Sequence, residues 1–259
     1  MKFIRLLLSI VMVFFFSGVN SAVAKQPFQI PSSVRDITKE NTFLNEEQEV
    51  SELQPTELTK ELLSTSKAKI TNPKFIRMLN ETDMNKSPFA FGVRAEIYLG
   101  EWPLSYHSEE TTPNWQYQKI NTNFYDNRGG KNNYQMHYVQ ETYKVVKGGL
   151  SAKVPRADEV QEMVLKSATK KTKLPLTYST VIGNGTKQND IYNVAPKTAG
   201  YLHSFAPAIH EKGTATFGEV YLVMSGWNRA VVVKNLTSKR VTAWIPIKNH
   251  LSFSYQSVR

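Results

Sequence analysis

The hydrophobic pattern changes its period along the chain, and each change predicts a helix or a strand. After Pro55, which suits a first helical position, three residues recur at helical spacing: Leu58, Leu62 and Leu63. Asn72 and Pro73 predict the start of a second helix, with Asn72 as its N-cap. A third helix is predicted over 158–171, where apolar residues share one face and lysines gather near the end.

Strand signals fill most of the remaining chain. Strict alternation over 89–99 is the clearest strand, and weaker alternations over 115–120 and 134–139 flank a turn at 126–130, which predicts an antiparallel hairpin. Further strands are predicted over 174–182, 199–206, 218–224, 230–233, 241–247 and 251–255. The breaks between them are predicted at 183–185, 211–213, 225–226 and 249–250. The predicted fold class is α+β, a mostly antiparallel β-sheet with two or three packed helices.

The N-terminal sequence has the pattern of an export signal. Residues 1–24 hold a basic start, an apolar run over 6–16 and small residues ending at Ala24. That run is shorter than the roughly 20 residues that a spanning helix needs. We therefore expect a cleavable signal peptide, with a short membrane-anchoring helix as the alternative. The protein is expected to be secreted or extracytoplasmic, and associated with the cell wall.

The mature chain is expected to contain an arm and one main domain. Residues 25–52 have few periodic apolar positions and carry an acidic run, which predicts an extended acidic arm. Four residues are the expected anchors of this arm: Phe28, Ile30, Phe43 and Leu44. Residues 53–259 are expected to form a single α+β domain, and a division into two subdomains near 154 stays open.

The amino-acid composition limits the kinds of site and partner that the protein can have. The chain has no cysteine, which excludes disulfides, thiolate metal sites, cysteine nucleophiles and a lipoprotein anchor, and is common among exported proteins of Gram-positive bacteria. Net charge rises from −4 over 25–66 to +1 over 67–143 and +11 over 144–259. Outside such a cell, the expected partners are an anionic wall polymer or an anionic lipid surface, not nucleic acid. A solvated basic surface is the simpler alternative.

Four sequence blocks resemble the YfkD-like proteins of Bacillus and its relatives. They are LQPTELTKELL at 53–63, NWQYQKINTNFYDNRGG at 114–130, KGGLSAKVP at 147–155 and AWIPIKNHLSF at 243–253. The resemblance implies an exported protein. It supplies no activity, cofactor or catalytic residue to transfer.

No catalytic motif is evident. The five histidines lack metal-ligand spacing, and neither a serine elbow nor a complete phosphate loop is present, so we expect no metal and no cofactor. A wall-active hydrolase would need two converging carboxylates. The candidates for that pair are Glu96, Glu101, Asp126, Glu141 and Glu219, and their spacing does not show whether any two meet.

Aromatic residues are dense over 98–143 and lie among amides and an arginine. This mixture is typical of sugar-binding and peptide-binding grooves, although aromatic cross-strand pairs give the same composition without a ligand. The candidate ligand-binding residues are Trp102, Tyr106, Trp115, Tyr117, Arg128 and Tyr134. We therefore expect a non-enzymatic binding or interaction protein of the cell envelope, with a carboxylate hydrolase as the alternative.

Overall fold

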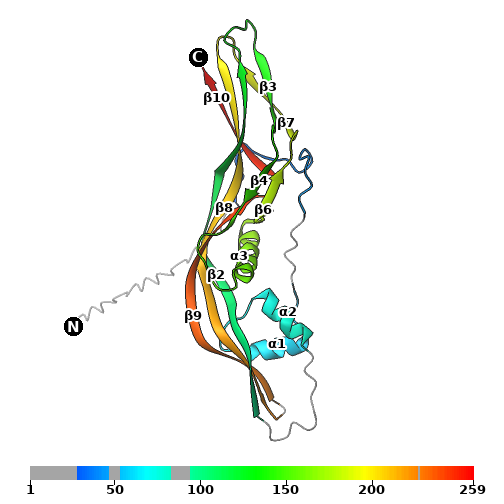
Figure 1. Ribbon diagram of the computed structural model, residues 1–259, viewed down its shortest axis with the longest axis vertical. Coiled ribbons are helices and arrows are strands. Elements are labelled where there is room, and N and C mark those ends of the chain that lie inside the picture. The colour runs from blue at the N-terminus through cyan, green and yellow to red at the C-terminus, as the bar shows by residue number, and fades with distance from the viewer. Residues whose placement is uncertain (1–27, 47–52, 83–93, 227) are drawn as a thin grey trace, which may run out of the picture.

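A long twisted antiparallel sheet is the largest structural element of the molecule (Figure 1). The structure is a computed structural model that describes residues 28–46, 53–82, 94–226 and 228–259. In the main sheet the strands are ordered β1-β10-β8-β9-β5, and β2 pairs with β8 along the other side of β8. These strands are β1 (Val34–Asp36), β2 (Arg94–Asp126), β5 (Gly149–Leu150), β8 (Ala199–Ser225), β9 (Asn228–Pro246) and β10 (His250–Val258).

Two small sheets and three helices lie on the same side of the long sheet (Figure 1). The small sheets pair β3 (Tyr134–Val139) with β7 (Lys187–Val194), and β4 (Lys144–Lys147) with β6 (Ser179–Ile182). The helices are α1 (Glu57–Ser64), α2 (Pro73–Glu81) and α3 (Ala157–Thr172). The predicted fold class, a mostly antiparallel sheet with packed helices, is confirmed.

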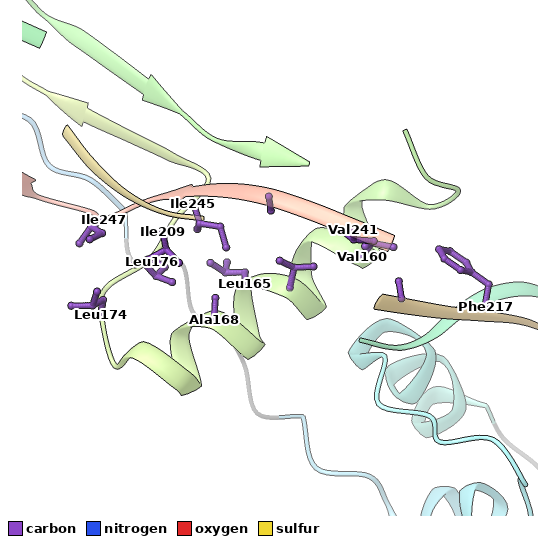
Figure 2. Close-up of a cluster of buried hydrophobic side chains, with 13 residues drawn as sticks. Val160, Leu165, Ala168, Leu174, Leu176, Ile209, Phe217, Val241, Ile245 and Ile247 are labelled. Atoms are coloured by element: carbon purple, nitrogen blue, oxygen red, sulfur yellow. The ribbon is translucent and has the colours of Figure 1, made fainter. Parts of the chain in front are cut away.

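Three clusters of buried side chains follow one another along the sheet. One lies beneath α1 and α2, one beneath α3, and one beneath the two small sheets. Figure 2 shows the middle cluster, where Val160, Leu165 and Ala168 of α3 face side chains of β8 and β9. The opposite face of the sheet carries no described helix (Figure 1), so alternate residues of β8 stay partly exposed on that face.

The strands are longer than the sequence predicts. Residues 199–206 and 218–224 belong to one strand, β8, and the predicted break at 211–213 is wrong. Gly213 is a site of close packing instead of a turn, because a Cβ there would lie 2.2 Å from the His107 backbone oxygen of β2. In the same way, 230–233 and 241–247 fall within the single strand β9, except that Ile247 lies just past its end.

The predicted hairpin between 115–120 and 134–139 is also wrong. Both segments are strands, but β2 pairs with β8, and β3 pairs with β7. The side chains of Asn121 and Asn123 donate to the Val139 oxygen at 2.7 and 2.8 Å, so side-chain bonds connect β2 to β3 in place of a backbone ladder. Of the predicted strand over 89–99, residues 94–99 lie in β2, and the rest falls outside the described residues.

The helices match their sequence signals closely. Asn72 caps α2 by accepting hydrogen bonds from the backbone N–H groups of Lys74 and Phe75, as predicted. Helix α3 covers the predicted range within one residue at each end. Pro55 does not occupy a first helical position, because Thr56 is the N-cap of α1 and the helix begins at Glu57.

The described part of the N-terminal arm is attached to the sheet. Strand β1 pairs with β10, and Ile37 directly after it is completely buried. Among the expected anchors, Phe28 packs against the middle cluster, whereas Leu44 is 92% exposed and anchors nothing. The signal peptide and most of the acidic run fall outside the described residues.

Candidate functional site

The six predicted ligand-binding residues do not form one site. Trp102 is buried, with its ring 5.0 Å from that of Phe75 and the Arg156 guanidinium 3.9 Å above it. Tyr106 donates a hydrogen bond of 3.2 Å to Glu211, and burial together with that carboxylate raises the Tyr106 pKa. Both residues face the helical side of the sheet and stabilise its core.

Two more of the six lie near the β2–β3 turn, at the end of the sheet closest to the C-terminus (Figure 1). Arg128 forms an ion pair of 2.6 Å with Asp126, and its hydrogen bonds lower the pKa of that carboxyl to about 2. Tyr134 stacks on Tyr125 with ring centroids 3.5 Å apart. These are contacts of the kind expected if the aromatic residues stabilise the sheet and bind no ligand.

Trp115 and Tyr117 both lie at an irregularity in β2, although they pack against different clusters. Asn114 pairs with Ala208 and Gln118 with Ala206, so three residues of β2 lie opposite the single residue Pro207. A proline in a central strand cannot donate to the ladder, and a bulge in the neighbouring strand accommodates it. The bulge leaves residues 115–117 without regular partners on β8.

A hollow of about 610 Å³ opens beside this bulge. That volume is within the range of roughly 300–1,000 Å³ that is usual for small-molecule sites. Strands β2, β8, β9 and β10 and the N-terminal arm all contribute to its lining, which consists of Pro31, Ser33, Thr112, Pro113, Asn114, Trp115, Gln116, His210, Trp244 and Ser252.

Stacked rings form one wall of the hollow. Trp244 is stacked on His210 at 4.2 Å and on Tyr117 at 5.0 Å between ring centroids. Burial lowers the pKa of His210 below its ordinary value of 6.5, and the positive charge of Lys212 lowers it further. His210 is therefore a neutral imidazole at pH 7.

Among the candidate carboxylates, Glu101 of β2 and Glu219 of β8 lie directly opposite each other in the sheet, but neither lines the hollow. Glu96 accepts from Lys234, and Glu219 accepts from Tyr221 and Asn235 at 2.9 Å each. None of the described residues that line the hollow is an aspartate or glutamate. Glu211 is fully buried in β8, and its Oε2 atom has no hydrogen-bond partner among the described residues; the turn predicted at 211–213 gives no sign of this buried carboxylate.

Part of the positive charge of residues 144–259 has identified partners. Arg156, Lys212 and Lys234 form ion pairs with described carboxylates, and Lys171 and Arg229 also have interaction partners. Lys166 and Lys170 lie one turn apart on α3, and Lys173 follows at its C-cap. Lys170 and Lys173 are exposed and Lys166 partly so, and none of the three forms an ion pair with another described residue.

The described residues contain neither a membrane-spanning helix nor a metal-binding cluster. No helix among them is long and apolar enough to cross a membrane. They contain no group of three or more histidine, aspartate or glutamate side chains placed to hold a metal ion.

Comparison with known proteins places residues 31–259 within the profile of the YfkD-like protein family. A relative from Bacillus subtilis (strain 168), described as uncharacterized protein YfkD, is 54% identical over 248 residues, which cover 95% of this chain and 94% of the relative. Among solved structures, a lamprey immune protein overlaps 63% of this chain and 53% of its own, at 6% identity and a TM-score of 0.26. That TM-score is too low to indicate a shared fold.

Proposed function

The chain belongs to the YfkD-like family, and on that premise we propose that it is an exported, non-enzymatic binding protein of the cell envelope. Its ligand in this proposal is an anionic wall polymer. The observation that carries the proposal is the row of cations on α3, namely Lys166, Lys170 and Lys173, which lack carboxylate partners among the described residues.

The contrast between paired and unpaired lysines supports binding of a polyanion at α3. An ion pair on the surface neutralises both partners and leaves little field outside the protein. Lys60, Lys212 and Lys234 are in that state, since each ammonium lies within 2.8 Å of a carboxylate oxygen. Cations without such partners attract a polyanion through a field that salt screens over about 8 Å at physiological ionic strength.

The hydrolase alternative has a weaker observation in its favour, the facing of Glu101 and Glu219 across β2 and β8, where Glu219 is already hydrogen-bonded to Tyr221 and Asn235. Its mechanism needs two carboxylates about 5–10 Å apart across one bond. The hollow beside Trp115 is lined by rings, amides and hydroxyls, and no carboxylate lies among its described lining residues. Binding is therefore the function that the geometry supports best.

Charge-neutralising variants test the proposal. The triple variant Lys166→Gln, Lys170→Gln, Lys173→Gln removes the unpaired row, and Lys60→Gln, Lys212→Gln, Lys234→Gln is the matched control with the same change in net charge. Binding to purified anionic wall polymer is measured by co-sedimentation at low and high salt. We expect the α3 triple variant to lose much more affinity than the control.

Equal losses in the two triple variants would show that only net charge matters and would contradict the role of α3. Preferential binding of the purified protein to anionic lipid vesicles over the wall polymer would contradict the proposed ligand. Absence of binding at low salt would overturn the proposal as a whole.

A further inference from the structure

The hollow beside Trp115 has a chemistry different from that of the cationic row. All of its described lining residues are uncharged at neutral pH, because His210 is a neutral imidazole and the remainder are rings, amides, hydroxyls and prolines. The nearest lysine on β8, Lys212, is held by Glu110 at 2.8 Å. An anionic ligand would find no counter-charge among the lining side chains.

We propose that this hollow is a binding site for an uncharged sugar unit of an oligosaccharide. A sugar ring has apolar C–H faces that pack on aromatic rings, and its hydroxyl groups need hydrogen-bond partners at the ring edge. The hollow offers both, since its lining includes the aromatic residue Trp115, the amide residues Asn114 and Gln116 and the hydroxyl residues Thr112 and Ser33.

Trp115 is the ring available to a ligand. Trp244 has His210 stacked on it at 4.2 Å and Tyr117 at 5.0 Å, so its neighbours in the protein already occupy it. Trp115 is half-buried and packs partly against the middle cluster, and it makes no ring-to-ring contact with another described residue. The stacked rings of His210, Trp244 and Tyr117 stabilise one wall of the hollow. Trp115 supplies the surface on which the sugar packs.

The bulge presents this ring together with the amides. Three residues of β2 opposite Pro207 interrupt the regular alternation, so Trp115 and Gln116 both line the hollow although they are adjacent in sequence. The Asn114 Oδ1 atom accepts from the Gln116 backbone N–H at 3.0 Å, which fixes the turn and leaves the Asn114 amide N–H₂ as a donor.

The test uses the purified exported protein and two uncharged probes, a tetramer of N-acetylglucosamine and maltotetraose. Affinity is measured by calorimetry, and the contact by transfer of magnetisation from tryptophan protons to sugar protons. We expect one probe to bind with a dissociation constant at or below about 1 mM, independently of salt. Trp115→Ala should weaken that binding at least about tenfold, and Trp115→Phe should retain most of it.

Phe124→Ala is the matched control, because Phe124 is an aromatic residue of the same strand that is 51% exposed and does not line the hollow. Thermal unfolding checks that every variant is folded. Failure of both probes to bind at about 10 mM, or equal binding by Trp115→Ala and the parent protein, would overturn the assignment. The outcome is separate from the proposed function, since the α3 triple variant should bind the sugar normally.

Discussion

Replacing Ile37 by alanine tests how the N-terminal arm is attached. Ile37 is 0% exposed and packs in the cluster beneath the small sheets, among Leu251 and Phe253 of β10. Its backbone N–H donates to the Asn249 oxygen at 2.8 Å, and that bond survives the substitution. The change therefore removes buried methyl and methylene groups alone.

The expected cost is about 2–5 kcal/mol of unfolding free energy, the usual loss for a buried Ile→Ala change. For a domain of this size, each kcal/mol lowers the melting temperature by about 2–4 °C, so the midpoint should fall by roughly 4–20 °C. Leu44→Ala is the matched control within the same arm. It is 92% exposed, and its substitution should change stability by less than about 0.5 kcal/mol.

Thermal unfolding followed by tryptophan fluorescence measures both variants, together with a chain that lacks residues 25–52. Ile37→Ala and the deletion should both lower the midpoint, and Leu44→Ala should not. If all three variants melted with the parent protein, and proteases cut the arm freely in the intact protein, the arm would be a free tail and the reasoning would be refuted.

Three further predictions concern polar groups. Asn72→Ala should cost about 2–4 kcal/mol in urea unfolding, because it removes the α2 cap and the bonds of Asn72 Nδ2 to Pro103 and Glu159. Tyr106→Phe should cost about 1–3 kcal/mol by the same measurement, since it removes the donor to buried Glu211; no change would mean that this contact is not formed. Because the His210 pKa is lowered by folding, the unfolded chain takes up that proton first, so stability should fall as pH drops below about 6.5, and less steeply in His210→Gln.

Local signals in the sequence predicted the elements whose causes are local. Asn72-Pro73 gives the cap and first turn of α2, and the apolar face of 158–171 gives α3 within one residue. The period-two pattern identified strands for the same reason. In each case the residues that determine the element lie within a few positions of one another.

Strand pairing was less predictable, because it depends on residues distant in sequence. The turn at 126–130 ends β2, yet β3 pairs with β7, about 50 residues farther along the chain. Gly213 lies in a segment whose residues are typical of a turn. The reason for a glycine there is the close approach of β2, because a Cβ at this position would lie 2.2 Å from a backbone oxygen of that strand.

The candidate site was predicted only in part, for the same reason. Trp115 and Tyr117 were expected from aromatic density, but His210 and Trp244 come from β8 and β9. They meet the first two only through the register of β2 on β8 and of β8 on β9. No local pattern marks them, and the spacing of the histidines does not distinguish His210 from the other four.

Co-sedimentation with purified cell walls, before and after mild removal of their anionic polymer, tests the central claim most directly. We predict that the purified protein binds intact walls at low salt, is released at high salt, and binds stripped walls much less. Equal binding to intact and stripped walls, or binding that salt does not change, would contradict it.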